Sequence, residues 1–197
     1  MTSSSPVAAV ILERDSADLR CLAALLDAHR QWEIETKSRA SIKALREWLW
    51  FYWQVPRRPQ PLVRSKYPAP FPWSEEARLA IIADPNCALV MEHCEPVHLV
   101  IRDLLDHPLV DLNQLRELLH TRLACCVITK AEDAAINAAG FGTRMVPGAE
   151  HDRWARYRAA GIDPERFRPF TDPAFNQGSG LPLSACGLVR QPDSPSR

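Results

Sequence analysis

The chain has 197 residues, of which 46% are hydrophobic and 24% charged, and its formal net charge is zero at pH 7. This length suits one ordinary domain, and the composition is typical of a globular protein, which excludes a disordered chain. Seven glycines against seventeen prolines argue against a turn-rich β-sandwich, because tight hairpins need residues that adopt positive φ. No window of about 18 apolar residues occurs, so no transmembrane helix is expected.

The N-terminus and the cysteines predict a cytoplasmic protein. The first six residues carry no basic side chain, and the apolar stretch 7–12 is shorter than a secretory signal needs. The six cysteines include no CxxC pair, and most of them lie inside apolar runs, where a free thiol behaves as a small hydrophobic side chain. Reduced, mostly buried cysteines are therefore expected.

The zero net charge hides a segregation along the chain. Residues 36–70 contain eight Lys or Arg and one acidic residue, whereas residues 71–120 contain three Arg and nine acidic residues. The basic stretch also contains aromatic side chains, and arginines beside aromatic planes can hold phosphates and stack bases. We therefore consider DNA or RNA as a partner, through Lys43, Arg46, Arg57, Arg58, Arg64 and Lys66.

The N-terminal part is predicted to be helical. Leucines at helical spacing after Ser16, a plausible N-cap, indicate a helix over about 16–35. A second helix is expected over 41–53, and its apolar face becomes nearly continuous at Trp48, Trp50 and Trp53. Such a helix is buried on more than one side or contacts a partner.

A proline-rich stretch follows, and it marks the only candidate internal boundary. Six prolines between residues 54 and 73 predict an extended connection without elements of its own, and the preceding helix should end before Pro56. The expected organisation is a helical segment 1–55, a basic connector 56–73, a main core 74–170 and a poorly ordered tail 171–197.

The main core alternates helices with two short apolar runs. Ser74, Asp111 and Thr129 are predicted to cap helices, the last one in a capping box with Glu132. The two apolar runs, 87–91 and 123–129, are the strand candidates. The fold class is therefore α+β, a predominantly helical single domain with a small two-stranded sheet. Strands joined by helices are expected to run parallel.

Parallel strands would bring polar side chains together at one edge of the sheet. Glu92 and His93 follow the first strand, and Lys130, Glu132 and Asp133 follow the second. An imidazole with an ordinary pKa near 6.5 is suited to acid–base chemistry at neutral pH. This edge is therefore the candidate active site.

The order Glu92-His93, Asn113, His120 resembles the motif of the HNH (ββα-metal) endonucleases over residues 92–120. The resemblance implies that His93 is a general base, that Asn113 orients it, and that Glu92 and His120 hold a divalent metal, Mg²⁺, Mn²⁺ or Zn²⁺. The zinc-binding Cys pairs of that family are absent. The residues between His93 and Asn113 are predicted to be helical, where the family has a β-hairpin and a loop.

Other site assignments stay open at this point. Asp84, Glu92 and Lys130 could form an acid–acid–lysine nuclease set, although the spacing to Lys130 is long for the usual strand motif. Cys94 and His98 have i, i+4 spacing and could bind zinc with two further ligands. Alternatively, His120 is an ordinary helix C-terminal residue that interacts favourably with the helix dipole.

The sequence thus predicts a protein that acts on nucleic acid, as a small metal-dependent nuclease or a toxin-like effector with His93 as base. The alternative is a non-catalytic interaction module, with the tryptophan-rich helix 41–53 and the proline-rich connector docking on a protein partner.

Overall fold

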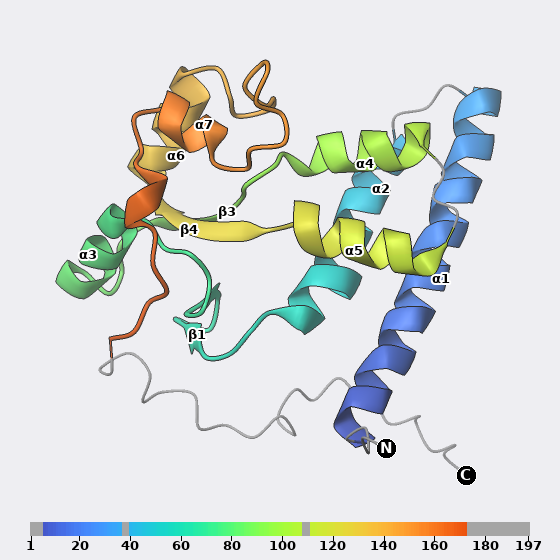
Figure 1. The fold of residues 1–197 in the computed structure, drawn as a ribbon, viewed down its shortest axis with the longest axis horizontal. Coiled ribbons are helices and arrows are strands. Elements are labelled where there is room, and N and C mark those ends of the chain that lie inside the picture. The colour runs from blue at the N-terminus through green and yellow to red at the C-terminus, as the bar shows by residue number, and fades with distance from the viewer. Residues whose placement is uncertain (1–5, 37–39, 108–110, 173–197) are drawn as a thin grey trace, which may run out of the picture.

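The computed structural model describes residues 6–36, 40–107 and 111–172, and over these residues the chain is predominantly helical (Figure 1). The α-helices are α1 (Pro6–Thr36), α2 (Ala40–Trp48), α3 (Glu75–Ala83), α4 (Val97–Asp106), α5 (Leu112–Arg122), α6 (Lys130–Ala138) and α7 (Ala155–Ala159). A π-helix, η1 (Leu49–Gln54), continues α2, and η2 (Val55–Arg57) and η3 (Pro164–Arg166) are 3₁₀ turns. The strands are β1 (Leu62–Val63), β2 (Tyr67–Pro68), β3 (Leu89–His93) and β4 (Cys125–Thr129). The predicted α+β class with predominant helix is confirmed.

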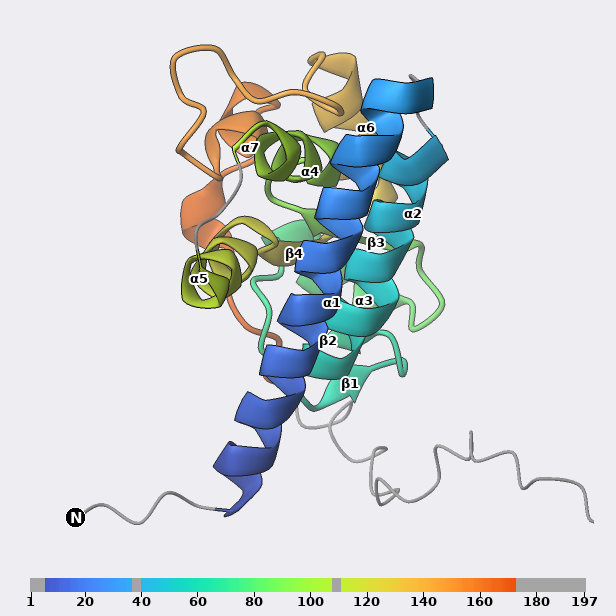
Figure 2. The same cartoon turned by 90° about the vertical axis from the view of Figure 1, so that its right-hand side faces the viewer.

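Helices α1, α2, α4 and α5 form one half of the molecule. The long helix α1 lies along α2 and crosses α4 and α5, which lie side by side (Figures 1 and 2). Their facing sides bury one apolar cluster that includes Leu22, Leu45, Leu104 and Leu119. Leucines from the N-terminal segment and from the predicted main core therefore share one core.

The other half is built around β4. Strand β3 pairs with one edge of β4, and the segment that precedes α3 pairs with the other, since Val127 N–H donates to Pro72 O and Ser74 N–H to Val127 O, both at 2.9 Å. Helices α3, α6 and α7 surround this sheet (Figure 1). All residues from Cys125 to Ile128 are buried, which explains why this strand reads as an uninterrupted apolar run.

The predicted parallel pairing of the two core strands is wrong. Strands β3 and β4 are antiparallel, with Leu89 opposite Thr129 and His93 opposite Cys125. The physical reason lies in the connection. Helices α4 and α5 leave the sheet at His93 and return the chain to the same end, so β4 runs back along β3 and no crossover is needed.

The proline-rich connector contains structure that the sequence analysis did not predict. Strands β1 and β2 form a small antiparallel hairpin whose turn residues, Arg64 and Ser65, have φ of 54° and 56°. Two consecutive residues with positive φ are typical of a tight hairpin turn, and neither is the usual Gly or Asn. The helical path also continues through Pro56, which occupies the first turn of η2, where a missing N–H costs no hydrogen bond.

Three of the predicted helix caps are confirmed, whereas Ser16 is not an N-cap, because it lies inside α1. Ser74 accepts from Ala77 N–H, Asp111 from Asn113 and Gln114 N–H, and Thr129 forms the capping box with Glu132. Helix α1 is longer than predicted, because it begins at Pro6 instead of near Ser16. The predicted tail falls almost entirely in residues 173–197, outside the described part. Over the described residues, no helix has the length and apolarity needed to span a membrane.

Candidate active site

Glu92 and His93 end β3 at the junction between the two halves. Strand β4 is followed directly by α6, which packs across both β3 and β4 (Figure 1). The unit is therefore an antiparallel strand pair with a helix on one face. Its polar end contains Glu92, His93 and, from α7, Arg156.

His93 is held by a side chain from the helical half. Its Nε2 lies 2.8 Å from Gln54 Oε1, and the amide nitrogen of Gln54 donates to Leu123 O at 3.2 Å. Because an amide oxygen can only accept, Nε2 must carry the ring proton, which leaves Nδ1 as the basic nitrogen. The Trp50 ring lies edge-on to the imidazole, with the centroids 6.2 Å apart.

Burial keeps this imidazole neutral. Desolvation is the main cause that lowers the pKa of His93 to about 4, and the positive charges of Arg46 and Arg156 lower it further. At neutral pH His93 is therefore an uncharged base with one fixed tautomer. A ring nitrogen with a free lone pair is one requirement for a general base, although the low pKa makes this nitrogen a weak base at neutral pH.

Arg156 connects the end of β3 to the loop after α6. Its guanidinium is fully buried and donates to the carbonyl oxygens of Phe141, His93 and Cys94 at 2.7 to 3.2 Å and, more weakly, to Gly142 O. It also forms an ion pair with Glu92 Oε1 at 3.0 Å. Each hydrogen bond offsets part of the cost of burying the cation.

Glu92 is the acidic residue of this site. Burial raises the pKa of Glu92, the adjacent Arg156 opposes that shift, and the negative charge of Asp133 on α6 adds to it. The Arg156 contact occupies only Oε1, so Oε2 remains for another ligand.

A cavity of about 470 Å³ opens at this site. It lies between the η1 helix, the end of β3 and the loop that follows α6. Its lining includes Arg46, Trp50, Glu92, His93, His98 and Thr143. A neutral base, a carboxylate and an arginine thus face one solvent-filled space.

The other residues that the HNH resemblance implies do not reach this cavity. Asn113 lies in the first turn of α5 and is exposed, and its backbone N–H serves the Asp111 cap. His120, near the end of the same helix, packs against the Trp53 ring at 5.4 Å and lines a different cavity. The structure therefore does not bring Glu92 and His120 together as a ligand pair.

The predicted meeting of the two strand ends is wrong, because it assumed parallel strands. Lys130 is exposed, and Glu132 is buried at the other end of the sheet, where Glu132 Oε2 accepts from Ser74 Oγ at 2.7 Å. Asp133 alone approaches Glu92, because α6 runs back across the sheet. Asp84 is exposed after α3, so the acid–acid–lysine set is not assembled.

The basic residues predicted to bind nucleic acid have different surroundings. Arg57 is bound by Asp15 and Asp18 at 2.6 and 2.7 Å, so its charge is balanced within the chain. Arg46 lines the His93 cavity and Arg58 lies over the Trp50 ring. The remaining three, Lys43, Arg64 and Lys66, are exposed.

The tryptophans of the predicted docking helix are largely internal. Trp53 is 2% exposed and belongs to the helical core, whereas Trp50 lines the His93 cavity and Trp48 stacks on Tyr52. The exposed aromatic side chains of this segment are instead Phe51 and Tyr52, at 56% and 59%.

Sequence reasoning missed Gln54 and Arg156, the two residues that hold the site together. Gln54 follows the tryptophan-rich run and precedes Pro56, and nothing in that pattern marks it as a partner of His93. Arg156 lies in a short helix among other arginines. The only signal in the sequence was that its neighbours are Ala155 and Tyr157, whose side chains suit a buried position and are buried in the structure.

A divalent cation can be tested against the side chains present. Mg²⁺ is commonly held by one or two carboxylates, with waters and substrate phosphate completing its shell. Glu92 lines the cavity and is one such carboxylate, but Asp133 is not among the lining residues, and the described residues contain no group of three His, Cys, Asp or Glu arranged to hold a metal. Cys94 is buried with its thiol toward Cys126, so it does not form a zinc pair with His98.

Comparisons with known proteins add no assignment, since no protein-family model, curated protein or solved structure matches the chain.

Proposed function

We propose that this chain is a cytoplasmic phosphodiesterase that acts on nucleic acid, with His93 as the general base. The observation that carries the proposal is the His93–Gln54 pair at the mouth of a cavity that also contains Glu92 and Arg46. A neutral imidazole with a fixed tautomer, beside a cation that can accept a phosphate, is the minimum set for activating water against a phosphodiester.

The observed order of elements supports the HNH resemblance better than the sequence did. The family's unit is a β-hairpin followed by a helix, and β3, β4 and α6 have this order, with α4 and α5 inserted between the strands. His93 ends the first strand, where the resemblance places the base. Gln54 then takes the orienting role that the resemblance assigned to Asn113.

In the proposed reaction, His93 Nδ1 accepts a proton from water, and the resulting hydroxide oxygen attacks phosphorus as the P–O bond to the leaving group breaks. Arg46 neutralises part of the phosphate charge. Glu92 would hold a Mg²⁺ or Mn²⁺ ion, which would supply further neutralisation of that charge when bound. Arg156 keeps Glu92 and the His93 backbone in place.

The test uses purified protein with Mg²⁺ or Mn²⁺ and labelled single- and double-stranded DNA and RNA. Cleavage is expected, and His93→Ala and His93→Gln should abolish it while thermal melts show that both variants are folded. His107→Ala is the matched control, because His107 is an exposed histidine outside the site. Intact substrates with the wild-type protein, or equal cleavage by the His93 variants, would overturn the proposal.

A non-catalytic docking module is the second candidate, and exposed aromatic side chains favour it. Phe51 and Tyr52 extend from η1 with more than half of their surface exposed. In this case Phe51→Ala and Tyr52→Ala should disrupt a complex or self-association and leave the monomer folded. A monomeric wild-type protein with no partner in pull-down experiments, together with His93-dependent cleavage, would favour the hydrolase.

A further inference from the structure

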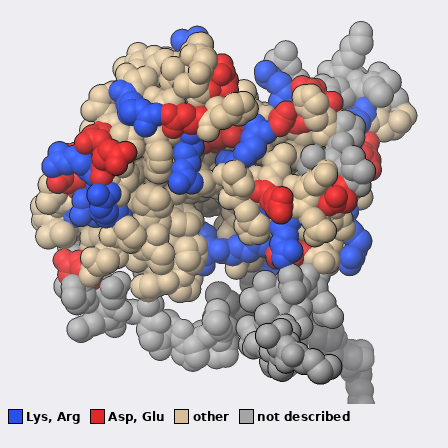
Figure 3. All heavy atoms as spheres, viewed as in Figure 1, with Lys and Arg blue, Asp and Glu red and all other residues tan. Residues whose placement is uncertain are grey.

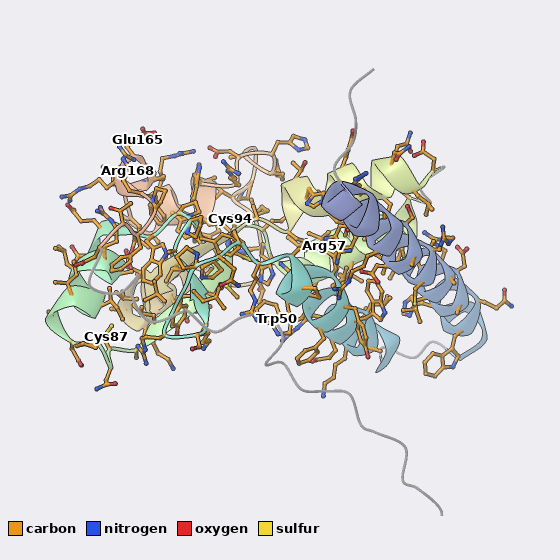
Figure 4. All side chains as sticks on the ribbon, turned by 90° about the horizontal axis from the view of Figure 1, so that it is seen from below. Trp50, Arg57, Cys87, Cys94, Glu165 and Arg168 are labelled. Carbon is orange, nitrogen blue, oxygen red and sulfur yellow. The ribbon has the colours of Figure 1, made fainter. Side chains whose placement is uncertain are left out.

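A second cavity of about 300 Å³ adjoins the His93 site. It lies at the junction of the two halves, between the η1 segment, the start of β4 and the residues before α7. Figure 4 labels three residues around it, with Trp50 and Arg57 coming from the helical half and Cys94 from the end of β3. Its aromatic walls are Trp50, Trp53, Phe71 and Trp154.

The polar lining of this cavity is basic. Arg57, Arg58, Arg153 and His120 line it, and no Asp or Glu is among its lining residues. Figure 3 shows Lys and Arg side chains on both sides of the hollow between the two halves. The His93 cavity, by contrast, includes Glu47 and Glu92.

Two of these arginines, Arg58 and Arg153, have a positive charge that is available to an anionic ligand. Arg57 is balanced by Asp15 and Asp18, but over the described part of the chain neither Arg58 nor Arg153 forms an ion pair. Arg58 lies 5.8 Å from the Trp50 ring centroid, and Arg153 lies 5.3 Å from that of Trp154. Cations placed over aromatic faces beside an open space suit a flat ring that carries an anionic group.

The two cavities share a wall. Trp50 and Gln54 line both of them, and Gln54 is also the residue that fixes His93. A ligand in the aromatic cavity is therefore one side chain away from the proposed base. This arrangement suits a nucleotide whose base lies in one cavity and whose phosphate lies in the other.

We propose that the second cavity binds an unstacked base of single-stranded nucleic acid, and that the adjoining phosphate lies in the His93 cavity. The inference rests on the proposed function for the position of the phosphate, and it adds a base site and a preference for single strands. A base inside a duplex is stacked and paired, so it cannot lie between the aromatic walls of this cavity without being unpaired.

The test measures binding without cleavage. Fluorescence anisotropy would follow a labelled 12-nucleotide single strand, a duplex of the same sequence and unlabelled nucleoside monophosphates as competitors, all with EDTA present. The single strand is expected to bind at least about 5-fold more tightly than the duplex, because loss of one stacked base alone weakens binding by roughly 5- to 150-fold. The monophosphates should compete only weakly.

Two variants probe the cavity, each with a matched control. Trp50→Leu and Arg153→Gln should each weaken single-strand binding by about 5-fold or more. Tyr52→Leu, on the same π-helix, and Arg168→Gln, at the far end of the molecule in Figure 4, line neither cavity and should leave binding unchanged. Arg153 is exposed, so Arg153→Gln remains informative if Trp50→Leu fails to fold.

The outcomes separate this inference from the proposed function. Trp50- and Arg153-dependent binding of single strands without any cleavage would support the base site and overturn the hydrolase. His93-dependent cleavage with equal affinity for single strand and duplex, unaffected by both variants, would overturn the base site and leave the hydrolase standing. Monophosphates that bind as tightly as the oligonucleotide would overturn the preference for a strand.

Discussion

His93 Nε2 lies 2.8 Å from Gln54 Oε1, and this hydrogen bond joins the sheet to the helical half of the molecule. Gln54 ends the π-helix η1, and its amide nitrogen also reaches Leu123 O, just before β4. π-Helical turns are rare and occur often at functional sites. Here the turn places Trp50 and Gln54 on the side that faces the site.

Replacing Gln54 should change the protonation of His93. Gln54→Glu places a carboxylate beside Nε2, which favours the imidazolium and should raise the pKa of His93 from about 4 toward or above its ordinary value. Gln54→Leu should leave the pKa of His93 low but remove the hydrogen bond that fixes its ring. NMR titration of the histidine ring signals measures both, and an unchanged His93 pKa in Gln54→Glu would contradict the hydrogen bond.

The low pKa of His93 should make stability depend on pH. Between about pH 6.5 and 4 the unfolded chain binds a proton on this histidine that the folded chain does not. The stability that comes from a neutral His93 is therefore complete above about pH 6.5 and is lost as the pH falls. The full effect is about 3 kcal/mol. The raised pKa of Glu92 acts in the opposite sense, because stability from that group falls as pH rises.

The contribution of His93 to stability can be separated from that of Glu92 by comparing how the stability of variants depends on pH. Denaturant unfolding at several pH values should show a shallower loss of stability below pH 6.5 in His93→Gln than in the wild type. His107→Gln serves as the control, since this side chain is exposed. Parallel curves for the wild type and His93→Gln would argue against a buried neutral His93.

Removing Arg156 should destabilise the chain strongly. Arg156→Met leaves Glu92 without its cation and three well-placed carbonyl oxygens without a donor, and breaking a buried ion pair costs about 3–5 kcal/mol. Adding Glu92→Gln should recover part of that loss by removing the unpaired charge. Arg158→Gln, an exposed neighbour, should cost roughly 0.5 kcal/mol or less, as measured by urea unfolding.

Ser74 joins two helices through one carboxylate. Its hydroxyl caps α3 and donates to Glu132 Oε2, which also accepts from Thr129 at the start of α6. Ser74→Ala should cost about 1–3 kcal/mol, since it removes a cap and a donor to a buried acid. A double-mutant cycle with Glu132→Gln should show coupling, and Glu76→Gln in the same first turn of α3 should be nearly neutral.

Several features could be predicted from short stretches of sequence. The caps at Ser74, Asp111 and Thr129 depend only on residues within four positions, so their patterns were sufficient. The buried strand β4 could be recognised from its apolar run, and the position of Glu92 and His93 at a strand end followed from the same kind of pattern. The fold class followed from the order of these elements.

Other features depend on residues far apart in the chain. Strand direction is decided by where α4 and α5 return the chain, which no local pattern contains. The hairpin in the connector is local, but its turn uses two residues with positive φ that are neither Gly nor Asn, so no turn signal marks it. His93 and Gln54 are 39 residues apart, and Arg156 is 64 residues from Glu92.

The sequence by itself thus determined most of the helices, three of their caps, the two core strands and the presence of a histidine beside an acid at a strand end, because these follow from local hydrogen bonding and hydrophobic periodicity. Only the tertiary structure decided that the strands are antiparallel, that Asn113 and His120 lie away from His93, and that Gln54 and Arg156 contact it. The physical reason is that a site is assembled by packing between segments, and long-range packing is set by the shapes of whole elements.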